Sequence, residues 1–188
     1  MGTIMSDITV NVSENGIEIN NIAIQLPCDI SLLFSVLGEA VRKDFGKISS
    51  SEFNKDELDR LNSIAPQRAC YTWNTLGIHC HTDDGTSVNT ISLRMRDSSL
   101  FKHPEYYPAS MFSGIFTING KPWLKALEKG KKDDDSTELV VGEYSVYGSR
   151  SDNKSHFFSR SLKYSTVELS LYDDDDDDDL DFGDLFTK

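Results

Sequence analysis

Basic residues are scarce in this chain relative to acidic ones. Its 188 residues include 19 lysines and arginines against 31 aspartates and glutamates, and the formal net charge is −12. A surface with this balance repels nucleic acid and anionic lipids, since both are bound through positive charge. We therefore expect neither direct nucleic-acid binding nor membrane association, and instead expect a protein partner with a basic surface.

Cysteines and long hydrophobic runs are also few. The chain has three cysteines, Cys28, Cys70 and Cys80, at unrelated spacings, which predicts reduced thiols rather than a disulfide framework. No run approaches the roughly 18 apolar residues of a membrane span. The first seven residues lack the basic and apolar regions of a signal peptide. These features predict a cytoplasmic protein.

Sequence motifs of common catalytic sites are missing. No Gly-x-Ser-x-Gly motif, catalytic-cysteine signature or phosphate-binding glycine loop occurs. His79 and His81 lie two apart near Asp83 and would share one face of a strand, which makes them the candidates for a zinc site. No further His or Cys at a paired spacing supports this, and a solvent-facing pair of histidines is the commoner outcome. We therefore predict no enzymatic activity, no metal and no cofactor.

Alternation of apolar and polar residues predicts a mostly antiparallel sheet. Residues 69–95 contain two or three strands with a turn at 82–86, where Asp-Gly supplies the positive φ of a tight hairpin. We place this hairpin in the middle of the sheet, and we predict another at Asn15-Gly16. Further strands are predicted at residues 8–12, 16–26, 111–118, 139–147, 156–159 and 164–171.

Short helices are predicted between these strands. Asp29 can cap a helix that reaches Leu37 with apolar residues on one face, and Gly38 ends it. A second helix follows Pro122 and stops at Gly130. Weaker helical signal lies at 52–61, within a polar excursion at 47–67, and residues 129–135 read as a charged linker or loop tip. The prediction is one α+β domain over residues 1–172, with two or three short helices packed on one face of the sheet.

Residues 173–188 form an acidic tail. They hold nine aspartates and one lysine, a net charge of −8, which leaves −4 for residues 1–172. Mutual repulsion predicts that the tail is disordered and solvated. Two roles are open for the tail. It is a solubilising segment with no further role, or its apolar residues dock in a basic groove while its charges speed the encounter with the partner. The predicted partner-binding residues are Asp173, Asp174, Asp175, Asp176, Asp177, Asp178, Asp179, Asp181, Phe182, Asp184 and Phe186, with Asp83 and Asp84 at the hairpin tip as the weaker choice.

Short motifs in the body resemble those of a known class of small proteins. They are Ile24-x-Leu26-Pro27, Leu37-Gly38-Glu39 with Arg42, Tyr71-Thr72-Trp73-Asn74-x-x-Gly77-Ile78, Phe112-Ser113-Gly114 and Ile118-Asn119-Gly120-Lys121-Pro122. Over residues 16–124 this order is similar to immunity proteins that accompany bacterial polymorphic and contact-delivered toxins. The resemblance implies a cytoplasmic protein that binds one cognate toxin domain and occludes its active site. It implies no catalytic residues.

Two other functions remain open at this point. An acidic DNA mimic of phage or plasmid origin would occupy a nuclease or restriction enzyme, but it needs carboxylates spread over the body, whose net charge is only −4. A metal-dependent enzyme would use His79 and His81. We favour the immunity or inhibitor function, because an acidic globule complements the basic clefts of toxins that act on nucleic acid or nucleotides.

Overall fold

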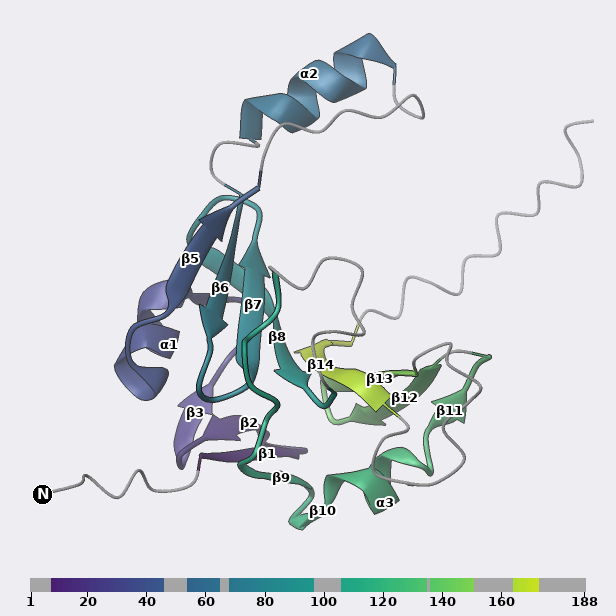
Figure 1. Ribbon diagram of the computed structural model, residues 1–188. Coiled ribbons are helices and arrows are strands. Elements are labelled where there is room, and N and C mark those ends of the chain that lie inside the picture. The colour runs from purple at the N-terminus through teal and green to yellow at the C-terminus, as the bar shows by residue number, and fades with distance from the viewer. Residues whose placement is uncertain are drawn as a thin grey trace, which may run out of the picture.

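The computed structural model describes residues 8–45, 54–64, 68–96, 106–134, 136–150 and 164–172. In these ranges the chain folds into two β-sheets and three helices (Figure 1). The predicted α+β class with mostly antiparallel strands is confirmed, because among the described pairs only β1 with β9 is parallel. The predicted strand at 156–159 and the acidic tail lie outside the described residues.

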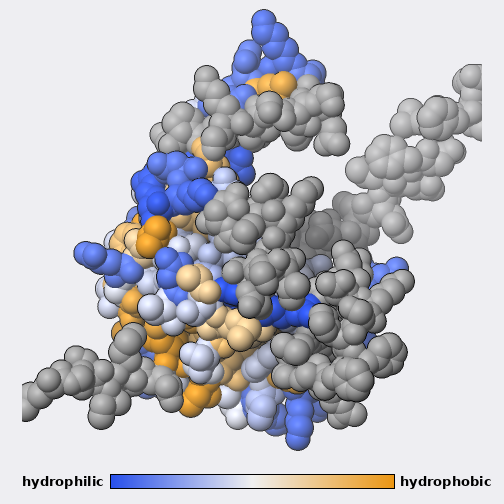
Figure 2. All heavy atoms as spheres, viewed as in Figure 1, coloured by the Kyte–Doolittle hydropathy of each residue, from blue (hydrophilic) through white to orange (hydrophobic). Residues whose placement is uncertain are grey.

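The smaller sheet has five strands in the described part of the chain. In order across the sheet these are β10 (Lys121–Pro122), β9 (Ile115–Ile118), β1 (Thr9–Ser13), β2 (Gly16–Ile19) and β3 (Ile22–Ile24). The predicted hairpin at Asn15-Gly16 joins β1 to β2, and Gly16 has a φ of +125°. Val10, Val12 and Ile17 point into the core, as the alternation predicts. Figure 2 shows hydrophobic residues at the surface near this sheet, where Ile22 and Ile115 are exposed.

The larger sheet contains the central hairpin. Its strands, in order across the sheet, are β11 (Lys131–Lys132), β12 (Ser136–Val141), β13 (Tyr144–Arg150), β14 (Tyr164–Leu171), β8 (Ser87–Arg94), β7 (Ile78–Thr82), β6 (Ala69–Trp73) and β5 (Val41–Asp44), and β4 (Cys28–Asp29) also pairs with β8. Strands β7 and β8 form the hairpin with the Asp-Gly turn, and both lie in the interior of the sheet, as predicted.

The three described helices are α1 (Ile30–Leu37), α2 (Lys55–Ile64) and α3 (Trp123–Leu127). The predicted cap of α1 is confirmed, because the Asp29 carboxylate accepts a hydrogen bond from the Ser31 backbone N–H at 2.8 Å. Gly38 ends this helix with a φ of +82°. Helix α2 lies beyond the β5 end of the larger sheet and has a hydrophilic surface (Figures 1 and 2).

The core lies between one face of the larger sheet and a layer made by the smaller sheet, α1 and α3. On the α1 side, Phe34 packs against the rings of Tyr71 and Trp73, and the Trp73 indole N–H donates to the Gly38 carbonyl at 2.9 Å. On the α3 side, the Trp123 ring lies between Phe116 and Tyr164. Aromatic side chains therefore anchor both ends of this layer.

Several segments differ from the sequence prediction. Residues 16–26 and 139–147 each belong to two antiparallel strands joined by a turn, and β5 was not predicted. The strand predicted at 111–118 begins only at Ile115, because residues 111–114 cross the end of the larger sheet, where the Phe112 N–H donates to the Arg94 carbonyl at 2.7 Å. The segment at 129–135 is more than a linker, since Lys131 and Lys132 pair with β12 as the edge strand β11. Both arrangements depend on glycines: a Cβ on Gly77 would overlap the Phe112 backbone, and one on Gly130 the Glu138 carbonyl.

Replacing Gly77 and Gly120 by alanine distinguishes the energetic cost of backbone strain from the cost of steric overlap with the Phe112 backbone. Both glycines have positive φ, +70° and +69°, but a Cβ on Gly120 would meet nothing within 4 Å. We expect Gly120→Ala to lower the free energy of unfolding by about 1 kcal/mol through strain alone. Gly77→Ala should cost about 2–4 kcal/mol, because it adds overpacking. Urea denaturation of both variants tests this, and equal losses would contradict the proposed contact.

Candidate functional site

A row of polar side chains crosses the face of the larger sheet opposite the core. The strand register puts Thr72 opposite His79, His79 opposite Ser92, and Ser92 opposite Glu168. Residues directly opposite one another share a face of the sheet, so the four side chains form a continuous row over β6, β7, β8 and β14. This row contains the histidine that the sequence singled out as a metal candidate.

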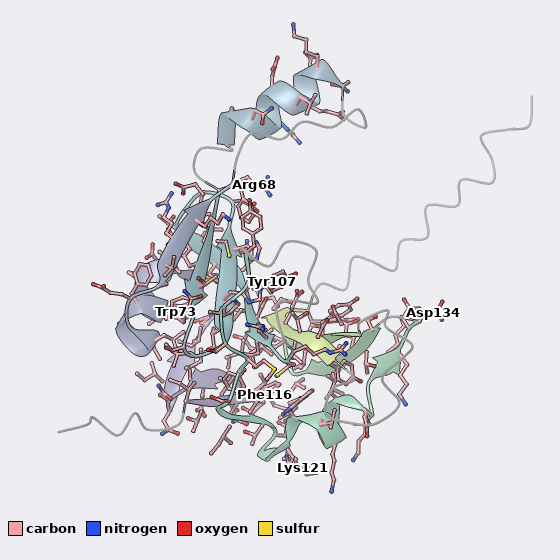
Figure 3. All side chains as sticks on the ribbon, viewed as in Figure 1. Arg68, Trp73, Tyr107, Phe116, Lys121 and Asp134 are labelled. Atoms are coloured by element: carbon pink, nitrogen blue, oxygen red, sulfur yellow. The ribbon has the colours of Figure 1, made fainter. Side chains whose placement is uncertain are left out.

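His79 is buried in this row and held neutral. The residue is 3% exposed, and the edges of the Tyr107 and His81 rings lie against its imidazole, with centroids 5.2 and 5.6 Å away. Burial, then the charges of His81 and Arg94, lower the pKa of His79 to about 3. Its Nδ1 atom has no hydrogen-bond partner in the described structure. Figure 3 shows Tyr107 over the middle of the sheet.

Cys70 lies beside His81 but is poorly suited to nucleophilic chemistry. Its Sγ is 3.9 Å from His81 Nε2 and donates to the Tyr106 carbonyl at 3.2 Å. Burial raises the pKa of the Cys70 thiol to about 12, so the reactive thiolate is not populated at neutral pH. The Tyr106 ring also stacks on Phe45, at a centroid distance of 4.7 Å.

Arg94 holds residues 106–108 against this face. Its side chain is 2% exposed, its Nε donates to the Arg96 carbonyl at 2.5 Å, and one of its terminal nitrogens donates to the Pro108 carbonyl. Burial also raises the pKa of Glu168, and burial together with the Glu168 charge raises that of Tyr107. The polar row is therefore covered by residues 106–108, and His79, Glu168 and the neighbouring Tyr107 are biased toward the neutral form.

No group of three or more His, Cys, Asp or Glu that could hold a metal ion occurs within the described ranges. His79 and His81 do share a face, as the sequence spacing requires, but their rings meet edge to face at 63° beside Tyr107 and Phe45. In the described structure the two rings pack against aromatic neighbours.

The two aspartates predicted at the hairpin tip have different roles. Asp84 Oδ1 accepts hydrogen bonds from the backbone N–H groups of Thr86 at 2.9 Å and Ser87 at 2.6 Å, and from the Thr86 hydroxyl at 3.3 Å. The bonds from Ser87 and Thr86 lower the pKa of Asp84. Asp83 is turned outward: its side chain is 75% exposed and lies 3.4 Å from Arg68 Nε. Asp84 builds the turn, while Asp83 is exposed beside Arg68. The predicted tail residues lie outside the described residues.

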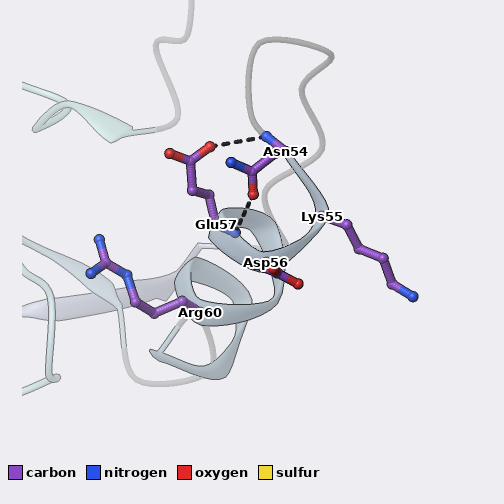
Figure 4. Close-up of a pocket in the computed structure, with 5 residues that line it drawn as sticks. All are labelled: Asn54, Lys55, Asp56, Glu57 and Arg60. Carbon is purple, nitrogen blue, oxygen red and sulfur yellow. Dashed lines mark hydrogen bonds between the residues drawn. The ribbon is translucent and has the colours of Figure 1, made fainter.

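An open hollow of about 590 Å³ lies at the start of α2. Figure 4 shows that two of its lining residues pair with each other: the Glu57 N–H donates to the Asn54 side chain, and the Asn54 N–H donates to the Glu57 carboxylate, both at 3.0 Å. This is a capping box, which satisfies the free N–H groups of a helix start. Asn54 and Glu57 at this hollow therefore serve to cap α2.

A groove of about 390 Å³ between α3 and β12 was not predicted from the sequence. Its rim carries Lys121, Lys125 and Lys129, and its floor is largely apolar. One sequence signal was available, since a lysine recurs at every fourth residue from 121 to 129 in a strongly acidic chain. Figure 3 labels Lys121 at this end of the molecule.

A protein-family model, described as a domain of unknown function, DUF7738, matches residues 9–133. The chain belongs to the DUF7738 family. The match includes the smaller sheet, the central hairpin and the three groove lysines, and it ends before β12. Comparisons with curated proteins and with solved structures each found no match. Within the described residues of this DUF7738 member, no helix combines the length and apolar character needed to cross a membrane.

The buried His79 predicts a pH dependence of stability for this DUF7738 chain. A histidine in the unfolded chain titrates near pH 6.5, whereas folded His79 titrates near 3. Between these values the unfolded state binds one more proton, so stability is fully present above about pH 6.5 and falls by about 1.4 kcal/mol per pH unit below it. Urea unfolding at pH 5 to 7 measures this slope.

The control separates His79 from its neighbour. His79→Asn should flatten the slope, while His81→Asn should retain most of it, because burial and the Arg68 charge lower the pKa of His81 but the Asp83 charge opposes them. Glu168 is present in both variants, so its opposite titration cancels in the comparison. An unchanged slope in His79→Asn would refute the assignment.

Proposed function

We propose that this protein is an immunity-type inhibitor that acts in the cytoplasm, binds one cognate toxin domain through that domain's basic surface, and occludes its active site without catalysis. The observation that carries the proposal is the concentration of charge at one end of the chain, where residues 173–188 hold −8 of the net −12. Such a segment attracts a basic partner at long range.

The attachment of the acidic segment supports this function. It follows directly after β14, which is hydrogen-bonded to β8 on one side and to β13 on the other. The last described residue, Tyr172, adds a hydrogen bond from its N–H to the Glu143 carbonyl at 2.8 Å. An interior strand is difficult to displace, so a partner that binds the tail is held to the body of the inhibitor.

The hairpin tip offers a second contact. The hydrogen bonds to Asp84 fix the turn, and they leave the Asp83 carboxylate exposed in a defined position. A preformed loop loses little conformational freedom on binding, which favours affinity. The body differs from a DNA mimic, because residues 1–172 have a net charge of only −4 and carry a groove lined by three lysines.

Neutralisation of a toxin tests this function. The probe is the stoichiometric partner that the full chain captures from its native host, expressed in a bacterium with and without the full chain. We expect the full chain to restore growth. Replacing Asp173–Asp179 by asparagine should slow association about tenfold at low salt and flatten its salt dependence, because long-range attraction is lost. Stopped-flow or surface-binding kinetics measure both effects.

Matched variants make this test specific. Replacing the same seven residues by glutamate keeps the charge and should leave the association rate unchanged. Asp83→Asn should weaken binding, while Asp56→Asn, at an exposed carboxylate on α2, should not. Failure of the full chain to restore growth, or equal kinetics for the asparagine and glutamate variants, would contradict the proposal. Binding to several unrelated DNA-processing enzymes would favour a DNA mimic instead.

A further inference from the structure

The lysine-rimmed groove combines two kinds of surface in one place. Lys121, Lys125 and Lys129 supply positive charge at its rim, and Asn119 adds an amide. Its apolar lining comes from three elements that are distant in the chain, with Ile118 at the end of β9, Pro122 and Ala126 around α3, and Leu139 on β12. A ligand that fits this surface carries carboxylates together with apolar side chains.

The groove lysines form no ion pair within the described part of the chain. Within the described ranges, the ion pairs shorter than 4.0 Å join Arg42 to Asp44 and Arg68 to Asp83, and none includes a groove lysine. Three lysines on one groove repel one another, and an acidic ligand relieves that repulsion. The site is therefore electropositive on a chain whose net charge is −12.

We propose that this groove binds residues 180–186 of the chain's own C-terminal segment. That segment reads Leu180-Asp181-Phe182-Gly183-Asp184-Leu185-Phe186, so it alternates the two chemistries that the groove presents. The leucines and phenylalanines contact the apolar floor, and Asp181 and Asp184 pair with the lysines of the rim. Apolar anchors in a groove with charged flanks are an established mode of peptide recognition.

The register of the larger sheet shows that the segment can reach the groove. Leu139 lies opposite Val146, and Val146 lies opposite Leu169, so Leu139 is two strand spacings, about 10 Å, from β14. Tyr172 follows Leu169 by three residues, which places the start of the tail roughly 15 Å from Leu139. The seven aspartates of 173–179 span up to about 23 Å when extended, enough to deliver residue 180 to the groove.

This contact would make the acidic segment self-sequestering. A tethered ligand acts at a high effective concentration, so the groove is occupied until a surface of greater positive charge competes for the same residues. A weakly basic surface would then not displace the segment from the groove, and high salt would weaken the contact between segment and groove. The inference does not rest on the proposed function, because the contact exists in the chain by itself and is tested without any toxin.

Carbodiimide cross-linking of the purified full chain tests the contact. The reagent activates a carboxylate, which then forms an amide with a lysine amine in direct contact, with net loss of water. At micromolar protein we expect links from Asp181 and Asp184 to Lys121, Lys125 or Lys129, found by mass spectrometry in the monomeric fraction. An equimolar mixture of ¹⁵N-labelled and unlabelled chains should give links within one isotope only. Mixed-isotope links would overturn the proposal in favour of contact between copies.

Two sets of variants keep the result specific. Phe182→Ala with Phe186→Ala leaves the charge unchanged and should lower the yield of these links about tenfold or more, because the apolar anchors are lost. Replacing Lys131 and Lys132 by glutamine should leave the links intact with the same melting temperature as wild type. Links spread evenly over all lysines, or a yield that Phe182→Ala with Phe186→Ala does not change, would show nonspecific attraction and refute the proposal.

Discussion

The pairing of β14 with β8 is the interaction on which the rest of the structure depends. It joins strands β11–β13 to strands β5–β7 in one sheet, with Val167 opposite Leu93 and Leu169 opposite Ile91. These four side chains are fully buried and form the middle of the apolar core. Without this pairing, each half would expose an unpaired sheet edge and half of a core. The smaller sheet, α1 and α3 cover the apolar face that the pairing completes.

The same pairing organises the opposite face of the sheet. Because side chains alternate along each strand, Ser92 and Glu168 meet on the polar side while their neighbours meet in the core. Residues 106–108 cover this face through hydrogen bonds from Arg94 and Cys70 to backbone carbonyls. One face of the sheet is thus covered by the apolar core, and the other by residues 106–108. Because Tyr107 packs over this face, His79 is buried although it lies on the side of the sheet opposite the core.

Strand β14 also decides how the charges of the chain are distributed in space. It delivers the acidic segment from an interior strand, about two strand spacings from the lysine groove. The groove residue Leu139 and the end of the strand that leads into the acidic segment are therefore close in the fold, although they are about 30 residues apart in the sequence. If both proposals hold, the groove and the partner compete for the same segment. Salt and the charge density of the partner would then control binding together.

Local chemistry determined much of this fold, and the sequence alone therefore predicted it. The Asp29 cap, the Gly38 stop and the turns at Asn15-Gly16 and Asp84-Gly85 depend on residues within a few positions of each other. Tertiary structure decided the rest. Residues 111–114 begin an apolar run that predicts a strand, but they cross the sheet end, because Gly77 lets the Phe112 backbone approach. The groove needs Ile118 and Leu139 from separate strands, and the pairing that unites them is set by burial over the whole core, which no local pattern encodes.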